Sequence, residues 1–447
     1  MPSTPAVYRL GARLLSGLAP VVSPLSSKLA AGHRGRRDAG RRLAAWAVRA
    51  RDRARPLVWF HASSVGEGLQ AESVLQELRG LVPEAQFVYT HYSPSAESLA
   101  RSLPVDAADY LPYDLPAAAD SLLEALRPSL LVFSKLDLWP ELATRAASRG
   151  TRVAIVAGTV SPGSGRLRWP ARSLLREGYR AVAAAAAVSE EDAGRLARLG
   201  VPPDAIQVLG DPRFDSVTKR ISGIGQDEPL LRYGAGAPTM VAGSTWPSDE
   251  AVLLAAFARV RALRPEARLI LVPHEPTEAH LAGVAEAARR AGLPAPVRLS
   301  AATDPVPLLL ADRIGVLATL YGAGTMAYVG GGFGRAGLHS VLEPAAWGVP
   351  VAFGPRWRES RDAALLIQAD AAVGLGASGR AAVEAMCLVW RDWMAQEERR
   401  SAQGSRARRV VEAGVGAAWR SAEMLSAAVT SLPLLRTSPT GGRPDPA

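Results

Sequence analysis

The chain has 447 residues, of which 48% are hydrophobic and 21% are charged. This composition excludes an intrinsically disordered protein, and the length exceeds what one hydrophobic core usually serves, so two domains are expected. The single cysteine, Cys387, excludes an internal disulfide and gives no sign of a thiolate metal site. The six histidines show no ligand spacing, so we expect no metal.

The net charge of +10 belongs to the first 55 residues, which carry 12 basic and two acidic residues. Apolar residues recur at helical spacing over 7–18, and a second apolar face includes Leu43 and Trp46. A basic amphipathic helix pair suits the surface of an anionic membrane. We therefore predict that residues 1–55 form a basic amphipathic, membrane-associating arm.

The same residues admit three other interpretations. Arg9, Arg13 and Pro20 interrupt the apolar run, so the sequence does not predict a confident membrane-spanning helix. Nucleic-acid binding is disfavoured because interleaved stacking aromatics are absent, and we expect no nucleic-acid partner. An arm packed on its own domain, with its arginines in water, remains the plainest alternative.

Residues 58–79 predict the first strand–turn–helix unit of a parallel α/β sheet. The apolar run 58–60 is followed by Ser64, Gly66 and Glu67, and then by a helical pattern. Ligands of such sheets bind beyond the carboxyl ends of the strands, where these three residues fall. Glu67 in the first helical turn can serve as a general base, or it can merely complement the helix dipole. This stretch alone favours the second interpretation.

Strands alternating with helices continue through both halves of the chain. The expected strands are 87–90, 130–133, 153–157, 181–188, 240–242, 269–272, 326–329 and 349–353. Ser189 and the acids after it predict a capped helix start. The Gly-rich, polar stretch 216–237 reads as a linker. The fold class is therefore α/β, with two Rossmann-like doubly wound domains facing across a cleft.

The expected domains are a basic arm (1–55), an N-terminal acceptor-binding domain (56–215), a C-terminal nucleotide-sugar-binding domain (216–432) and a disordered tail (433–447). In the C-terminal domain three loops follow strands at one sheet edge. They contain the residues Gly243, Ser244 and Thr245; Pro273 and His274; and Gly331 and Gly332. Glycines let a ligand approach the backbone, and a helix N-terminus favours a phosphate, so a nucleotide is expected here. Glu343 is placed to bind a ribose diol.

Taken together, these segments resemble the Kdo transferases, which attach 3-deoxy-D-manno-octulosonic acid (Kdo) to a lipid A precursor. The resemblance runs from the arm to about residue 375. It rests on HASSVGEGLQA (61–71), PYDLP (112–116), DLWPEL (137–142), GDPRFD (210–215), AGSTWPSDE (242–250), VPHEP (272–276) and YVGGGFGRAGLHSVLEPAAWGVPVAFGP (328–355). It implies the GT-B arrangement, a CMP-activated sugar donor, no metal or other cofactor, and inversion at the anomeric carbon.

The resemblance also implies roles for individual residues. Glu67 matches the catalytic base, and Arg213 stands where the family usually has a lysine that stabilises the transition state. Lys135 occupies a position where the family has a glutamate. The CMP-contacting positions are Pro273 and His274 (usually Pro-Arg), Ile314, Gly315 and Val316 (usually Met-Gly-Glu), and Ser340, Val341, Leu342 and Glu343 (with Asn usual in place of Ser340).

The implied reaction moves Kdo from CMP-Kdo to a lipid A precursor during lipopolysaccharide synthesis. The implied location is the cytoplasmic face of the bacterial inner membrane, with a nucleotide sugar, a lipid acceptor and the anionic membrane surface as partners. Two alternatives stay open. One is an epimerase or a transferase with another nucleotide-sugar donor, suggested by Lys135, His274 and Val316. The other is a membrane-associated relative that has lost the reaction.

Overall fold

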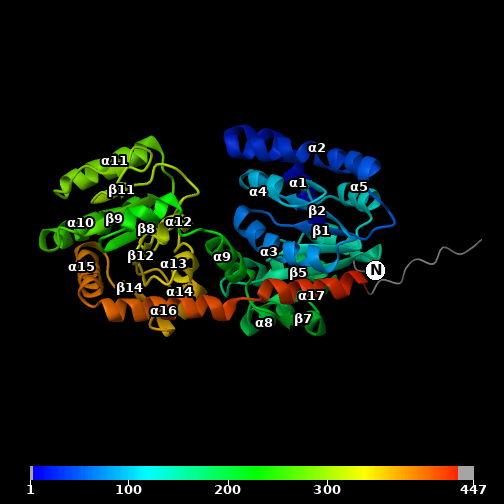
Figure 1. Cartoon of the computed structure of the whole chain (residues 1–447). Helices are drawn as coiled ribbons and strands as arrows, with labels where there is room; N and C mark the ends of the chain where they lie inside the picture. Colours follow the sequence, from blue (N-terminus) through cyan, green and yellow to red (C-terminus); the bar gives the residue numbers. More distant parts are fainter. Residues whose placement is uncertain (1–3, 431–447) are drawn as a thin grey trace, which may run out of the picture. The chain divides into compact units, whose positions relative to one another are not determined.

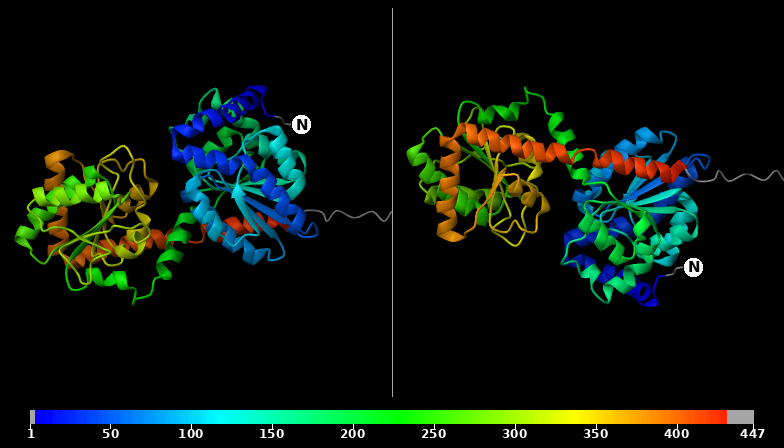
Figure 2. Two further views of the ribbon diagram at one scale, coloured as in Figure 1. Left: turned by 90° about the horizontal axis from the view of Figure 1, so that it is seen from above. Right: turned by 90° about the horizontal axis from the view of Figure 1, so that it is seen from below.

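The computed structural model describes residues 4–430 and divides into two compact units (Figures 1 and 2). The first unit comprises the chain up to Asp215 together with the segment that starts at Gly416. The second unit is Ser216–Val415. The predicted tail, 433–447, lies outside the described residues. Each unit has its own parallel sheet covered by helices, which is the α/β class expected from the sequence.

The first unit is built on a seven-stranded sheet in which all neighbours are parallel, in the order β3-β2-β1-β4-β5-β6-β7. Its strands are β1 (Leu57–His61), β2 (Gln86–His91), β3 (Ala107–Tyr110), β4 (Leu130–Ser134), β5 (Arg152–Gly158), β6 (Val182–Ala187) and β7 (Ile206–Val208). The strand order reverses between β1 and β4. Residues that follow these two strands therefore lie at the topological switch point, where such sheets bind ligands.

Helices cover both faces of this sheet because its central strands are apolar on both sides. They are α1 (Ala6–Val22), α2 (Ser27–Ala50), α3 (Val65–Leu81), α4 (Glu97–Ser102), α5 (Pro116–Leu126), α6 (Pro140–Ser148), α7 (Ala171–Arg180), α8 (Glu190–Leu199), the start of α9 (Pro212–Ser222) and α17 (Ala417–Thr430). The predicted cap of α8 is confirmed, since the Ser189 side chain accepts a hydrogen bond from the Asp192 N–H.

The second unit repeats the pattern with the parallel order β10-β11-β9-β8-β12-β13-β14. Its strands are β8 (Thr239–Thr245), β9 (Arg268–Pro273), β10 (Val297–Arg298), β11 (Leu308–Leu310), β12 (Met326–Val329), β13 (Val351–Phe353) and β14 (Ala372–Gly374). Its helices are α10 (Pro247–Leu263), α11 (Glu278–Arg290), α12 (Leu317–Tyr321), α13 (Leu342–Ala346), α14 (Arg361–Gln368), α15 (Gly379–Ala395) and α16 (Glu397–Gly414). Here the order reverses between β8 and β12.

Two sequence-based boundaries differ from the structure. The expected linker 216–237 contains the end of α9 and a 3-10 helix, Pro229–Gly234, so it is largely ordered structure. The last helix, α17, belongs to the first unit, although the sequence analysis assigned residues up to 432 to the second domain. The physical reason is burial: Ala418, Ala422 and Leu425 of α17 enter the apolar core of the first sheet.

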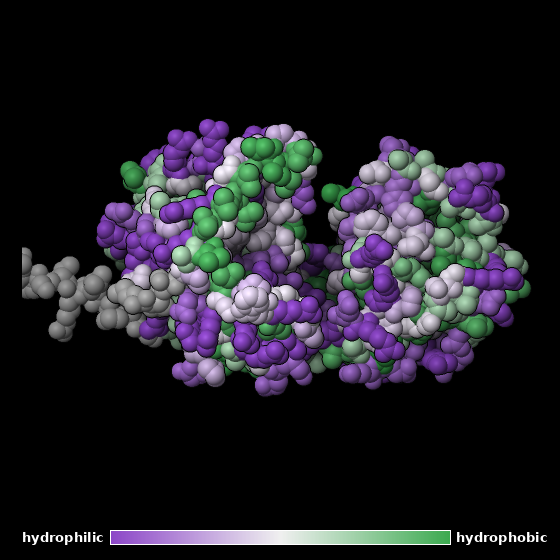
Figure 3. Space-filling model, turned by 180° about the vertical axis from the view of Figure 1, so that it is seen from behind, coloured by the Kyte–Doolittle hydropathy of each residue, from purple (hydrophilic) through white to green (hydrophobic). Residues whose placement is uncertain are grey.

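The N-terminal arm consists of α1 and α2, and no residue of α1 is fully buried. Large apolar side chains of α1 and the turn after it are exposed to water: Val7, Leu10, Leu14, Leu15, Leu18, Val21, Val22 and Leu25. Figure 3 shows a continuous hydrophobic run across one face of the first unit. Within residues 4–430, no helix has the length and apolar character needed to cross a bilayer.

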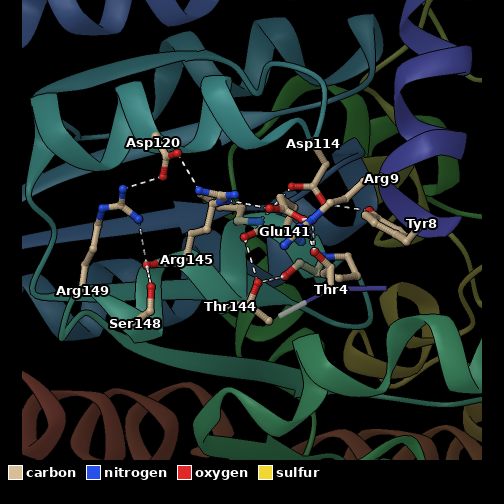
Figure 4. Close-up of polar contacts among 12 residues, drawn as sticks. Thr4, Tyr8, Arg9, Asp114, Asp120, Glu141, Thr144, Arg145, Ser148 and Arg149 are labelled. Atoms are coloured by element: carbon tan, nitrogen blue, oxygen red, sulfur yellow. Dashed lines mark hydrogen bonds and ion pairs between the residues drawn. The ribbon is translucent and has the colours of Figure 1, made fainter. Parts of the chain in front are cut away.

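A polar cluster holds the beginning of α1 against the body of the first unit (Figure 4). The Tyr8 hydroxyl donates to the buried Asp114 carboxylate at 2.6 Å, and Arg9 Nε lies 3.0 Å from the buried Glu141 carboxylate. Thr4 also donates to Glu141. Asp114 in turn accepts the backbone N–H groups of Glu141 and Leu142 at the start of α6. The arm is therefore fixed at one end to α6.

Candidate functional site

Glu67 lies at the switch point of the first unit, in the first turn of α3. Ser64 is the N-cap of this helix, and its backbone N–H and hydroxyl donate to Glu67 Oε2 at 3.0 and 2.7 Å. The dipole-complementing role considered for Glu67 is thus part of the structure, as a capping box. The side chain is nevertheless only half-buried, and a Cβ on neighbouring Gly66 would meet open space. The first turn of α3 is therefore accessible to a ligand.

The loop after β4 brings a second carboxylate, Asp137, to Glu67. Asp137 Oδ2 accepts the Ser63 N–H at 3.0 Å, and Ser134 Oγ donates to the Glu67 carbonyl at 3.0 Å. The Asp137 and Glu67 carboxyl groups are within hydrogen-bonding reach of each other. Two neighbouring residues, Ser63 and Ser64, thus hold one carboxylate each, which fixes the pair at the edge of the sheet.

Burial, followed by the Asp137 carboxyl, raises the pKa of Glu67 above its ordinary value. The Ser64 hydroxyl and the positive charge of Lys135 act in the opposite direction. A carboxylate with a raised pKa is a stronger base once it is ionised, which is the property that proton abstraction from a hydroxyl requires. Lys135 therefore lies within electrostatic reach of Glu67.

Arg213, the second expected catalytic residue, also belongs to the first unit. Its guanidinium pairs with the buried Asp211 carboxylate, with NH2 to Oδ2 at 2.6 Å and Nε to Oδ2 at 2.9 Å. Asp211 also lies 3.5 Å from Gln70 Nε2, one turn after Glu67 on α3. The Arg213 side chain is partly exposed. Asp211 therefore orients this charge on the side of α3 that carries Gln70.

His61, at the end of β1, connects the loop after β4 to the sheet. Its Nε2 accepts the Trp139 indole N–H at 2.9 Å, and its Nδ1 is 3.0 Å from the Thr90 hydroxyl. Complete burial lowers the pKa of His61 to about 3, so the ring is neutral at physiological pH. Because Nε2 must accept, Nδ1 carries the proton. The ring thus ties the loop that carries Asp137 to the sheet.

In the second unit the expected glycine loops meet at the switch point between β8 and β12. A Cβ on Gly330 would lie 2.3 Å from the Ser244 carbonyl oxygen, and one on Gly332 would lie 2.7 Å from the Gly354 backbone. Gly331 adopts a φ of +92°, and its Cβ would lie 2.0 Å from the Gly337 carbonyl oxygen. These loops therefore pack backbone against backbone, which only glycine allows.

The third expected loop joins them, because the His274 N–H donates to the Thr245 carbonyl at 3.0 Å. The buried Asp249 in the first turn of α10 accepts the N–H groups of Trp246 and Gly331, each at 3.0 Å, and the Tyr328 hydroxyl at 2.8 Å. Asp249 locks the glycine loop to α10. It also places a carboxylate at the helix N-terminus that the sequence analysis assigned to a phosphate.

A stack of three rings borders this edge. His274 lies against Trp246, with ring centroids 4.9 Å apart, and against His339, at 4.4 Å. The Trp246 indole N–H donates to His339 Nε2 at 3.0 Å. Burial, and then neighbouring His274, lower the pKa of His339 to about 4, which keeps it a neutral acceptor. His274 therefore forms part of a ring stack, at a position where the resemblance implies an arginine.

The remaining expected positions lie in the second unit as well. Ile314 is exposed, Gly315 has a φ of +86°, and Val316 is buried at the start of α12. Ser340 and Val341 precede α13, and Ser340 Oγ accepts the Leu342 N–H at 3.4 Å. Glu343 accepts a hydrogen bond from Arg220 at 2.9 Å. Burial raises the pKa of Glu343, and Arg220 opposes that rise.

Comparison with known proteins identifies the family. Residues 37–216 match the family described as 3-deoxy-D-manno-octulosonic-acid transferase (kdotransferase). The chain is 30% identical over 394 residues to the 3-deoxy-D-manno-octulosonic acid transferase of Bordetella pertussis, covering 82% of this chain and 86% of that protein. The chain belongs to the Kdo transferase family. The transferase of Chlamydophila psittaci is also 30% identical, over 69% of this chain and 72% of its own.

This membership confirms the resemblance seen in the sequence and makes the chain a glycosyltransferase. Its fold is shared with enzymes of low sequence identity. A UDP-GlcNAc 2-epimerase from Neisseria meningitidis matches with a TM-score of 0.59 and 13% identity, over 83% of this chain and 99% of that one. At this identity the likeness concerns the fold alone, which agrees with the two-domain α/β class.

Sequence reasoning missed several groups that the structure places at these two edges. Asp137 stands in the DLWPEL motif, and its position two residues before Trp139-Pro140 does not distinguish a turn residue from a site group. Trp246 directly follows the AGST loop, which is the signal that places it at a strand end. His339 and Trp246 are 93 residues apart in the sequence, and no local sequence pattern predicts their contact.

Proposed function

We propose that this Kdo transferase family member moves Kdo from CMP-Kdo to a lipid A precursor in lipopolysaccharide synthesis, with Glu67 as the general base. The observation that carries the proposal is the Glu67–Asp137 carboxyl pair at the switch point of the first unit, where the pKa of Glu67 is raised. Glu67 takes the proton of an acceptor hydroxyl. The hydroxyl oxygen then bonds to the anomeric carbon, and the bond to the CMP phosphate breaks with its electron pair on the phosphate.

A single displacement of this kind inverts the anomeric carbon and needs one base and no enzyme nucleophile, by analogy with inverting glycoside hydrolysis. Arg213, oriented by Asp211, is proposed to stabilise the charge that grows on the leaving phosphate. We further propose that no metal or other cofactor takes part. The charge balance then depends on arginine and backbone N–H groups.

The proposed nucleotide site is the set of glycine loops in the second unit. Backbone packing among Gly330, Gly331 and Gly332 supports a preformed cradle, because its shape does not depend on side-chain rotamers. The ring of His274 adds a flat surface at its border. Glu343 is proposed to bind the ribose diol. In that role its carboxylate would accept hydrogen bonds from the two ribose hydroxyls, and its hydrogen bond with Arg220 would weaken.

The proposed location is the cytoplasmic face of the bacterial inner membrane. The exposed apolar side chains of α1 and the 12 basic residues of the arm support contact with an anionic bilayer. Because Tyr8 and Arg9 fix the start of α1 to α6, membrane contact would hold the first unit, and with it Glu67, near a lipid acceptor.

The test is product formation with defined substrates. CMP release and a Kdo-bearing lipid, followed by mass spectrometry, are expected only when CMP-Kdo and the lipid A precursor are both present. A panel of uridine and cytidine nucleotides supplies the binding control. Tighter binding of a uridine nucleotide, or transfer of another sugar, would contradict the donor assignment and favour the related nucleotide-sugar enzyme suggested by Lys135, His274 and Val316.

A further inference from the structure

A group of arginines without partners follows β5 at the carboxyl edge of the first sheet. The loop after β5 and the first turns of α7 form an arginine segment, defined by Arg166, Arg168, Arg172, Arg176 and the indole of Trp169, which is 83% exposed. Within the described part of the chain, none of these four guanidinium groups has a hydrogen bond or an ion pair. Arg180, at the end of the same helix, pairs with Glu177 at 2.8 Å.

Several other arginines of this unit are paired with acids, although some, such as Arg198, form no ion pair within residues 4–430. Arg42 forms two bonds to Asp109, and Arg145 bridges Asp120 and Glu141. Four uncompensated guanidinium groups within eleven residues create a local positive field, which suits an anion, and a guanidinium matches phosphate oxygens in geometry. Arginines on a surface can also be solvated by water alone, so their charge does not by itself indicate an anion-binding site.

A second observation is the hydroxyl of Tyr179. The side chain is 1% exposed, and its hydroxyl has no hydrogen-bond partner among the described residues. Buried hydroxyls are nearly always bonded, so an orphan marks a group that something absent from the structure completes. Arg166 and Asp137 both lie within electrostatic reach of this hydroxyl. Burial raises the pKa of Tyr179 to about 12, so it remains a neutral donor at physiological pH.

The segment also borders the proposed reaction site. A Cβ on Gly178 would lie 2.8 Å from both Leu138 and Pro140, so α7 packs directly on the loop that follows Asp137. Asp137 is the partner of Glu67. β5 pairs with β4, and β4 pairs with β1, so the segments after these three strands share one edge. An anion held by the arginine segment would therefore lie beside the group that activates the acceptor.

We propose that the arginine segment and the Tyr179 hydroxyl bind a phosphate on the head group of the acceptor. This inference rests on the proposed function, since it concerns the acceptor of the same reaction. The half-buried Arg166 and the buried Tyr179 hydroxyl contact the phosphate from the protein side, and Arg168 and Arg172 contact it from the solvent side. Trp169 offers the non-polar surface that a glycolipid carries next to its charge. The segment thereby selects a phosphorylated acceptor and orients its hydroxyl toward Glu67.

The test measures equilibrium binding by calorimetry, with the full chain and a deacylated, water-soluble lipid A precursor head group. The head group is compared before and after phosphatase treatment. For the wild type, we expect removal of phosphate to weaken binding at least tenfold. The variant Arg168→Ala/Arg172→Ala should weaken binding of the phosphorylated form by a similar factor and leave the dephosphorylated form unchanged. Arg198→Ala, which removes an exposed arginine on α8, is the matched control and should bind like the wild type.

Tyr179→Phe tests the buried side of the site. Because the Tyr179 hydroxyl has no hydrogen-bond partner within residues 4–430, its removal should not lower the melting temperature, but it should weaken binding of the phosphorylated head group several-fold. If the hydroxyl had a structural role instead, Tyr179→Phe would lower the melting temperature and leave binding of the phosphorylated head group unchanged. The proposal is overturned if the double arginine variant binds the phosphorylated head group as the wild type does, or if it loses both forms equally.

Two further arms identify the source of the phosphate. If the variants lose binding to anionic phospholipid vesicles but keep full affinity for the soluble head group, the segment is a membrane contact and the proposal is wrong. If inorganic phosphate binds as tightly as the head group, the acceptor is not the ligand. These measurements need no donor. Phosphate-dependent binding without any Kdo transfer would therefore contradict the proposed function and leave the phosphate site standing.

Discussion

Both units reverse their strand order at a switch point, but the two strand orders differ, and so do the groups at that point. In the first unit the Glu67 and Asp137 carboxyl groups lie within hydrogen-bonding reach of each other, and the buried Tyr89 hydroxyl near Glu67 has no hydrogen-bond partner among residues 4–430. In the second unit the Asp249 carboxylate accepts three hydrogen bonds, which join α10 to its own N-cap, to Tyr328 on β12 and to the glycine loop. The difference fits the proposed roles, with proton transfer in the first unit and a rigid ligand cradle in the second.

Gly331→Ala should give the largest effect on the second unit. A Cβ there would lie 2.0 Å from a backbone oxygen, and the residue has a φ of +92°, so the loop must move. We expect a loss of roughly 2 to 5 kcal/mol in the free energy of unfolding of this unit, with CMP binding abolished. Gly334→Ala is the control, because its Cβ would meet no atom closer than 3.7 Å. Calorimetric CMP binding and urea unfolding measure both variants, and equal behaviour of the two would refute the rigid cradle.

Asp137→Asn and Lys135→Met should shift the pH dependence of the first unit in opposite directions. Asp137 raises the pKa of Glu67 and Lys135 lowers it. Since the base must be ionised, the acid limb of the kcat/KM profile should move to lower pH in Asp137→Asn and to higher pH in Lys135→Met. Glu124→Gln removes an exposed acid on α5 and should leave the profile unchanged. Shifts of the same sign in both variants would disprove the electrostatic assignment.

Tyr8→Phe should give the smallest effect, confined to the arm. It removes the 2.6 Å bond to Asp114 and should weaken the attachment of α1 by roughly 1 to 3 kcal/mol, visible as faster amide exchange in α1. Arg13→Ala on the same helix is the control.

The same contact carries a pH signature. Burial raises the pKa of Asp114 from its ordinary 3.8 to about 6 in the folded state. The folded state therefore binds the proton more tightly, and the stability that this proton confers is complete below about pH 4 and is lost as the pH rises through about 6. Because the Tyr8 bond lowers this pKa, Tyr8→Phe should extend the loss to higher pH. Stability that rises over this range through Asp114 would contradict the assignment.

The predicted strands illustrate what a sequence determines by itself. Buried parallel strands are apolar on both faces, so β4, β8 and β12 stand out as continuous apolar runs. β3, β7, β10, β11 and β14 were not predicted, because each is only two to four residues long, and all of them except β11 include residues that are not buried. The destination of α17 was missed for another reason: its apolar face fits either unit, and only tertiary contact with α3 and the first sheet decides.

Some residues of the candidate site can likewise be located from the sequence, and others only from tertiary contacts. Residues that a local motif carries, such as Ser64 and Glu67 in their capping box, can be located from spacing alone. Contacts between distant segments cannot, and they include the approach of Asp137 to Glu67 and the orphan hydroxyl of Tyr179 beside Arg166. These long-range contacts set the protonation of the site, so its electrostatics could be derived only from the structure.

The most direct test of the central claim is the single-turnover rate of Glu67→Gln. Glutamine also fits the third position of a capping box, so α3 should keep its start while the base is lost. With CMP-Kdo and lipid acceptor bound, we predict a rate of Kdo transfer about 10²- to 10⁴-fold below the wild type, with an unchanged Kd for CMP. Transfer at the wild-type rate would show that Glu67 is only a helix cap and that the base lies elsewhere.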